Sequence, residues 1–150
     1  MWLHGDANDI SQVPPAVFGE VITRLEDVTV YGSAHLTSDQ LSAIFTMLAG
    51  QQPGDFKLKR LRFVEVDMTA VTPEILVAGI QKLEEIWLHI TALRADQVNA
   101  VLSMVSEGRQ GRLNTIHMYR PNITGTICPV LLQSAQEVGG HRLYINLRSE

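Results

Sequence analysis

The sequence predicts an α/β protein built as a right-handed βα superhelix, with a curved parallel sheet on its concave side and helices on its convex side. An apolar spacing recurs four times, as Leu25-x-x-Val28-x-Val30, Leu58-x-x-Leu61-x-Phe63, Leu83-x-x-Ile86-x-Leu88 and Leu113-x-x-Ile116-x-Met118. The copies start 33, 25 and 30 residues apart, and segments with helical apolar spacing lie between them. One strand and one helix cannot bury their apolar faces alone, so neighbouring units must stack and share a core.

Each apolar run predicts a short strand, because alternate residues point to the same face of a sheet. Weaker copies lie at both ends of the chain. At the start, Leu3 is aligned with Leu61, and residues 9–15 parallel residues 67–73. At the end, Ile145-x-Leu147 is aligned with the strand, with Arg142 at the opening position. We therefore expect a single domain over residues 1–150, with about four full repeats and a partial repeat at each end.

The segments between the strands carry helix signals. Leu41, Ile44, Phe45 and Leu48 have the i, i+3, i+4, i+7 spacing of an amphipathic helix. Thr37 and Gln40 fit a capping box, and Gly50 fits the end of that helix. The same spacing recurs in a second segment that ends near Gly108, at Val98, Val101, Leu102 and Val105.

Two further helices are predicted to open at a proline. Thr72-Pro73 offers threonine as the cap and proline as the first helical residue, and Cys128-Pro129 opens a helix in the same way. The polar connectors at residues 51–55 and 109–112 are expected to be loops.

The chain resembles the leucine-rich-repeat family, in particular its ribonuclease-inhibitor-like type. The four apolar runs carry the likeness, together with the matching phrases LTSDQL at residues 36–41 and LRADQV at residues 93–98. The Asn or Cys that the family has after the strand is replaced here by Ser33, Val66, Thr91 and Pro121. An ordinary βαβ domain, such as a flavodoxin-like fold, is the alternative, although such folds do not repeat one motif at successive strands.

The outward strand positions are predicted to form the concave face in two columns. The first is expected to contain His4, Thr29, Arg62, Trp87, His117 and Asn146, and the second Asp6, Tyr31, Val64, His89, Tyr119 and Arg148. Aromatic side chains are common anchors of protein interfaces. The expected partner-binding residues are therefore Tyr31, Arg62, Trp87, His89, His117 and Tyr119. The alternative is that these rings only stabilise the sheet by cross-strand stacking.

Catalytic and metal chemistry is not expected. His89 and His117 fall diagonally on adjacent strands, but no third metal ligand accompanies them. Cys128 lies at a helix start, which favours the thiolate, but no histidine base belongs to that turn. The pairs Glu26-Asp27, Lys59-Arg60 and Glu84-Glu85 predict a ladder of alternating charge across the sheet. We expect no catalytic residue, no metal and no cofactor.

Composition limits the remaining classes. The formal charge of −4 argues against a nucleic-acid-binding protein, and the single cysteine excludes an internal disulfide. With 45% apolar and 19% charged residues, the chain has enough material for a core. No apolar run of membrane-spanning length and no signal peptide is visible, so a cytoplasmic protein without membrane contact is expected.

The family resemblance implies a non-catalytic scaffold that binds another protein through the concave sheet face. A narrower version is an array within an immune receptor of the nucleotide-binding leucine-rich-repeat kind. The alternative is a substrate-recruiting or regulatory region of an enzyme, such as a ubiquitin ligase or a GTPase-activating protein. Both ends lack the polar caps of a complete array, which suggests a fragment of a longer protein or self-association through the uncapped ends.

Overall fold

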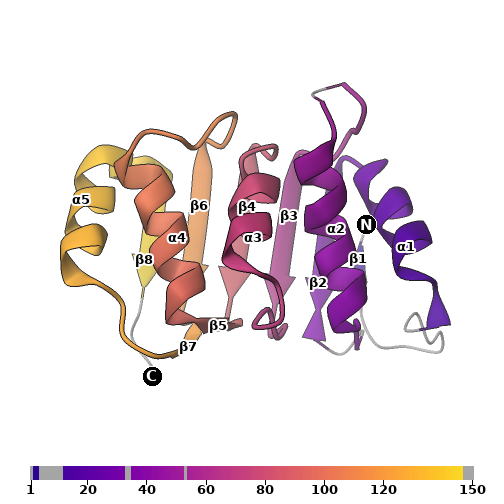
Figure 1. Ribbon diagram of the computed structural model, residues 1–150, viewed down its shortest axis with the longest axis horizontal. Helices are drawn as coiled ribbons and strands as arrows, with labels where there is room; N and C mark the ends of the chain where they lie inside the picture. Colours follow the sequence, from indigo (N-terminus) through magenta and orange to yellow (C-terminus); the bar gives the residue numbers. More distant parts are fainter. Residues whose placement is uncertain (1, 4–11, 33–34, 53, 147–150) are drawn as a thin grey trace.

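A parallel sheet runs along the molecule, and in Figure 1 its strands lie behind the helices. The computed structural model describes residues 2–3, 12–32, 35–52 and 54–146. Within these residues the main sheet has six strands, whose order follows the sequence without exception. They are β1 (Trp2–Leu3), β2 (Asp27–Tyr31), β3 (Arg60–Val64), β4 (Glu85–His89), β6 (Thr115–Tyr119) and β8 (Leu143–Asn146). The α/β class and the parallel sheet predicted from the sequence are confirmed.

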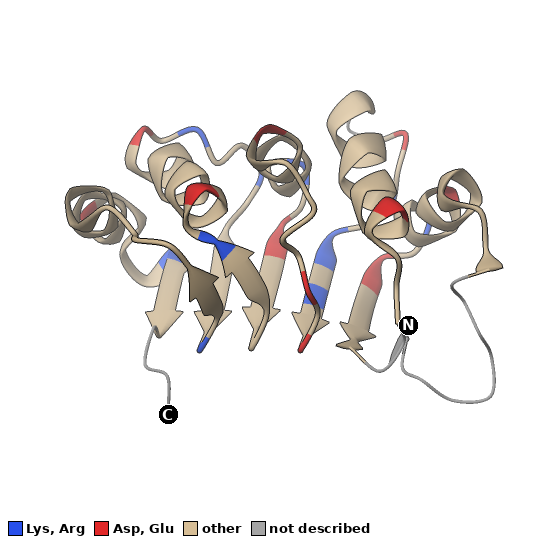
Figure 2. Ribbon diagram, turned by 60° about the horizontal axis from the view of Figure 1, so that its bottom comes forward, with Lys and Arg blue, Asp and Glu red and all other residues tan. Residues whose placement is uncertain are grey.

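The helices lie side by side on one face of this sheet (Figure 2). Among the described residues they are α1 (Pro15–Thr23), α2 (Ser38–Gly50), α3 (Pro73–Ile80), α4 (Ala95–Ser106) and α5 (Pro129–Gly139). Each helix lies in the connection between two parallel strands, as a parallel crossover requires. In the described part of the chain, no helix combines the length and apolar character needed to cross a membrane.

The helix starts agree with the sequence signals, with one correction. The Thr37 hydroxyl accepts a hydrogen bond from the Gln40 amide at 3.1 Å, and Gln40 Oε1 accepts one from the Thr37 amide at 3.0 Å, so the predicted capping box is confirmed. Thr72 and Cys128 precede α3 and α5 as predicted, but neither side chain makes a cap hydrogen bond. Thr72 thus occupies the predicted cap position before Pro73, but its side chain does not make the hydrogen bond expected of a cap. The following proline, which fixes the first helical φ, marks the start instead.

The core lies between the sheet and the helices. In β3, β4 and β6 the second and fourth residues are buried while the others are half-buried, which is the alternation expected of a sheet covered on one face. The buried strand residues are Val28, Val30, Leu61, Phe63, Ile86, Leu88, Ile116 and Met118. They belong to one cluster that extends from Phe18 on α1 to Leu143 on β8.

The strands pair in register from β2 to β6, but the predicted alignment of both ends is wrong by two residues. Leu143, not Ile145, pairs with Ile116, and Leu3 pairs with Val30, not with Val28. After α5, a 3-10 turn at Gly140–Arg142 leads directly into β8, so this strand begins earlier than the alignment predicted. Because side chains alternate with a period of two, the slip changes their neighbours and not their face. Of the predicted outward residues, His4, Asp6 and Arg148 lie outside the described residues.

The turns that follow the strands repeat in backbone geometry. Glu65, Ile90 and Arg120 each come directly after a strand and have positive φ values of 59°, 54° and 51°. Their amides donate to the carbonyls of His89, Tyr119 and Asn146 on the next strand, at 2.9, 2.8 and 2.7 Å. A main-chain ladder thus joins successive turns without the Asn or Cys of the leucine-rich-repeat pattern. Just beyond lies a short parallel pair that the sequence did not predict, β5 (Ala92–Arg94) with β7 (Asn122–Thr124).

Candidate functional site

The open face, which we define as the sheet face opposite the helices, carries all the residues predicted for partner binding. The register arranges its side chains in rows that cross the strands. One row contains Asp27, Arg60, Glu85 and Thr115; the middle row contains Thr29, Arg62, Trp87, His117 and Tyr144; the third contains Tyr31, Val64, His89, Tyr119 and Asn146. Asn146 therefore belongs to the third row and not, as predicted, to the row of Trp87. Tyr144 takes that place.

Four side chains of the middle row form a continuous stack. The Trp87 and His117 rings are 4.5 Å apart between centroids with an interplanar angle of 18°, and His117 and Tyr144 are 4.3 Å apart at 14°. At the other end, the Arg62 guanidinium carbon lies 5.2 Å from the centre of the Trp87 ring, within the range of a cation–π contact. This stacked row (Arg62, Trp87, His117 and Tyr144) crosses β3, β4, β6 and β8.

Glu85 fixes the position of Trp87. Its Oε1 accepts a 2.6 Å hydrogen bond from the indole nitrogen, and its Oε2 lies 3.6 Å from Arg62 and 3.5 Å from Arg60. Arg62 also pairs with Asp27 at 2.8 Å. Because the indole is held by a hydrogen bond at its edge and a guanidinium over its face, its rotamer is set before any partner binds.

The predicted charge ladder is confirmed in part. Lys59 pairs with Glu26 at 3.8 Å and Arg60 with Glu85, as the alternating signs required. Glu84, however, pairs with Arg112 at 3.3 Å, from the loop before β6. The ladder prediction also left out Arg62, which lies between Asp27 and Glu85 and joins the ladder to the stacked row.

The two histidines of the open face are in direct contact. His89 Nε2 and His117 Nδ1 are 2.8 Å apart, and the His89 ring also lies against Trp87, with 4.9 Å between centroids. Partial burial lowers the pKa of His89, and the neighbouring His117 and Arg62 lower it further. Burial also lowers the pKa of His117, although Glu85 acts in the opposite direction. Both rings are therefore harder to protonate than a free histidine.

The open face has a hollow of about 280 Å³ above Val64. Val64 is a short side chain between Tyr31 on β2 and His89 on β4, so the third row has a gap there. Thr29, Arg62 and Trp87 complete the lining. The Val64 hollow thus has an apolar floor and two aromatic walls, which suits a single apolar side chain from outside.

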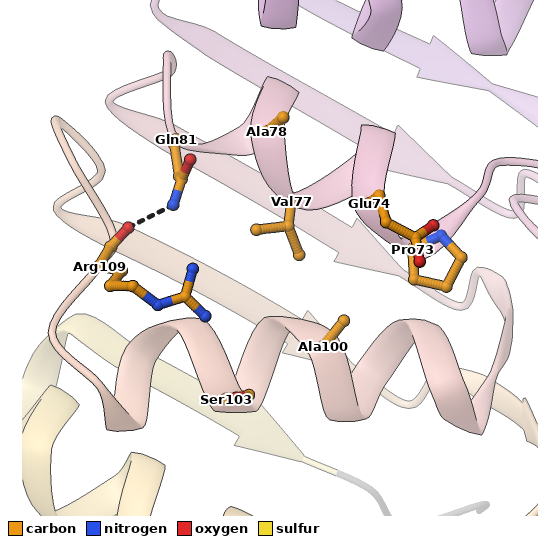
Figure 3. Close-up of a pocket in the computed structure, with 8 residues that line it drawn as sticks. All are labelled: Pro73, Glu74, Val77, Ala78, Gln81, Ala100, Ser103 and Arg109. Atoms are coloured by element: carbon orange, nitrogen blue, oxygen red, sulfur yellow. Dashed lines mark hydrogen bonds between the residues drawn. The ribbon is translucent and has the colours of Figure 1, made fainter.

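A second hollow lies on the other side of the molecule, between α3 and α4 (Figure 3). Its volume is about 410 Å³, and its lining is mostly small or apolar: Pro73, Glu74, Val77, Ala78, Gln81, Ala100, Ser103 and Arg109. At one end the Gln81 amide nitrogen donates to the Arg109 carbonyl oxygen. The ionisable side chains of its lining, Glu74 and Arg109, lie at opposite ends in this view, so the groove brings no reactive groups together.

Among the described residues, neither histidine of the open face lies near Cys128. The backbone amide of Cys128 donates to Asn99 Oδ1 at 2.9 Å, at the start of α5, whereas His89 and His117 lie on the opposite face of the sheet. Over residues 2–3, 12–32, 35–52 and 54–146, no three His, Cys, Asp or Glu side chains are grouped as metal ligands. No protein-family model matches the chain, and neither a curated protein nor a solved structure matches it.

Proposed function

We propose that this protein is a leucine-rich-repeat solenoid of the ribonuclease-inhibitor-like type, and that its open face binds another protein without catalysis. Sequential parallel strands in register, helices on one face and a repeated main-chain ladder at the turns support the solenoid. Strands are spaced by about 4.8 Å and helices by about 10 Å, so the helical side is longer and the open face is concave. A concave surface of this kind is what such arrays use to bind partners.

The observation that carries the proposal is the stacked row. Its rings contact one another face to face across neighbouring strands, and strand side chains stand roughly perpendicular to the sheet. The ring edges therefore point away from the sheet, toward a partner. Trp87 is already held by Glu85 and Arg62, so binding would cost little side-chain entropy. Tryptophan and tyrosine are the residues most enriched among binding hot spots.

The charge and shape of the open face indicate what kind of partner fits it. Asp27, Arg60, Arg62 and Glu85 are engaged with one another, so the face has little net charge to offer. The Val64 hollow, by contrast, has an apolar floor between aromatic walls. We therefore expect a partner protein that inserts one apolar or aromatic side chain above Val64 and lays a weakly charged segment along the stacked row.

The proposal is tested by a substitution that fills the Val64 hollow. Proteins captured from source cells by the immobilised chain are identified, purified, and measured for direct binding by calorimetry. Val64→Phe should weaken binding by about tenfold or more, because the new ring occupies the space of the anchoring side chain. Trp87→Ala should do the same by removing a rigid contact.

Val130→Phe is the matched control. It makes the same substitution at a valine on α5 that is 74% exposed, on the helical side of the sheet. This variant should bind like the native protein. If Val130→Phe weakens binding while Val64→Phe does not, the partner binds the helices and the proposal is wrong.

A further inference from the structure

The His89–His117 contact is a pair of imidazole nitrogens from two adjacent strands, brought within 2.8 Å of each other. The pair lies on the open face among aromatic rings: Trp87 stacks on both histidines, at 4.9 and 4.5 Å, and Tyr144 covers the other side of His117 at 4.3 Å. Each ring is therefore held in place by stacking, while the two nitrogens are directed at each other. Protein recognition alone does not require this arrangement.

Neutral imidazole is the commonest protein ligand for transition metals. In the hydrogen bond between the rings, one of the two facing nitrogens accepts and therefore carries no proton, so one lone pair is already available for a metal. One ring must only move its proton to its other nitrogen, so that Nε2 of His89 and Nδ1 of His117 both present lone pairs. No net proton is released, and the hydrogen bond between the rings is replaced by two metal–nitrogen bonds.

The 2.8 Å separation is the length of the hydrogen bond between the two rings, in which one nitrogen donates and the other accepts. To bind one ion with bonds of about 2.0 Å, both rings must turn so that their lone pairs meet at the metal. The preferred ion then follows from intrinsic affinity, because Cu²⁺ is the tightest-binding divalent ion of its series, ahead of Ni²⁺ and Zn²⁺.

We propose that His89 and His117 bind one divalent transition-metal ion, preferring Cu²⁺ over Ni²⁺ and Zn²⁺, with water in the remaining positions. With only these two protein ligands, the site is exchangeable and does not hold the fold together. The inference does not depend on the proposed protein partner. The hard cations Mg²⁺ and Ca²⁺ prefer oxygen ligands and should not bind this pair.

Trp87 provides the measurement, since Cu²⁺ and Ni²⁺ quench the fluorescence of a nearby indole. The sequence has two tryptophans, so the experiment uses the full chain with Trp2→Phe, which leaves Trp87 as the sole reporter. The protein is titrated at pH 7.5 with CuSO₄, NiCl₂, ZnCl₂ or MgCl₂ in a non-coordinating buffer. We expect saturable quenching by one Cu²⁺ per chain, reversal by EDTA, weaker binding of Ni²⁺, and no response to Mg²⁺.

Single His→Gln variants identify which side chains bind the Cu²⁺ ion. His89→Gln and His117→Gln should each weaken Cu²⁺ binding by at least about tenfold, because one of two nitrogen ligands is lost. His141→Gln, in the exposed turn before β8, and His4→Gln are the matched controls and should bind like the parent. Electron paramagnetic resonance of the Cu²⁺ complex should show coupling to two imidazole nitrogens, a result that does not depend on how any variant folds. The proposal is overturned if quenching survives in the His89→Gln and His117→Gln variants, or if the resonance spectrum lacks nitrogen coupling.

Discussion

The indole nitrogen of Trp87 donates a 2.6 Å hydrogen bond to Oε1 of Glu85, two residues earlier on the same strand. Residues two apart on a strand lie on the same face, so both side chains belong to the open face. The other carboxylate oxygen of Glu85 faces Arg60 and Arg62, and the Arg62 guanidinium lies over the Trp87 ring. One carboxylate thus connects the charge ladder to the stacked row, and a change at Glu85 should affect both.

Glu85→Ala should lower the free energy of unfolding by about 1–3 kcal/mol, because it removes the acceptor of the indole hydrogen bond and leaves two arginines without this partner. Glu85→Gln keeps an acceptor for Trp87 and should cost less. Urea denaturation followed by tryptophan fluorescence measures both. Glu20→Ala, which breaks the exposed Glu20–Arg24 pair on α1, is the control and should cost below about 1 kcal/mol. Equal losses at positions 85 and 20 would contradict a special role for Glu85.

The strands and most helix boundaries follow from apolar spacing and capping residues, because these record local burial. The sequence also predicts that the likeness between the units extends beyond their strands, since residues 9–15 parallel residues 67–73. In the structure, the carbonyls of Val13 and Val71 in these segments make equivalent hydrogen bonds. The carbonyl of Val13 accepts from the side chain of Gln40, and that of Val71 from Gln97, in the next repeat along the chain. The matching phrases at 36–41 and 93–98 contain these two glutamines.

What the sequence could not give was the register of the ends. The apolar pattern aligns the last strand on Ile145-x-Leu147, whereas the structure pairs Leu143-x-Ile145 with β6, and this difference is why the pattern omits Tyr144 from the open face. Both spacings are apolar with a period of two, so the pattern alone cannot choose between them. The length of the 3-10 turn after α5 decides the matter, and turn length is a tertiary property. The same limit applies to β5 and β7, whose three-residue lengths leave no periodic signal.

Gln97 should be one of the most sensitive polar positions in the protein. It is fully buried, its Nε2 donates to the carbonyls of Met68 and Val71, and its Oε1 accepts from the Arg94 amide at 2.8 Å. Gln97→Leu keeps the volume but removes these three hydrogen bonds from the interior, so we expect a loss of about 2–4 kcal/mol. Urea denaturation measures the loss. Gln136→Leu, at an exposed position of α5, is the matched control, and a similar loss there would contradict the explanation.

The histidine pair should make stability depend on pH. The pKa of His89 and that of His117 are lowered in the folded protein, so the unfolded chain binds more protons as the pH falls below the ordinary histidine value. Their contribution to stability is complete above that value and is lost as the pH falls through the folded-state pKa. The free energy of unfolding should therefore decrease between pH 7.5 and pH 5.

That decrease can be assigned by substitution. Urea denaturation at several pH values should show a shallower decrease in the double variant His89→Gln/His117→Gln than in the native protein. His141→Gln is the control for removing a histidine elsewhere, and its pH dependence should match that of the native protein. If the double variant is as sensitive to acid as the native chain, groups other than this pair cause the loss.

Two helical glycines should respond in opposite directions to the same substitution. A Cβ at Gly79 on α3 would meet the Phe45 ring at 2.9 Å and the Phe45 carbonyl oxygen at 3.0 Å, so α2 and α3 pack together only because this side chain is absent. Gly79→Ala must push helix backbone apart, and we expect a loss of about 1–3 kcal/mol despite the better helix propensity of alanine. Gly50, the last residue of α2, has open space where its Cβ would be, so Gly50→Ala should stabilise the protein by about 0.5 kcal/mol. Thermal and urea denaturation of the two variants measure the difference, and a Gly79→Ala protein as stable as the native chain would mean that the two helices are not in such close contact.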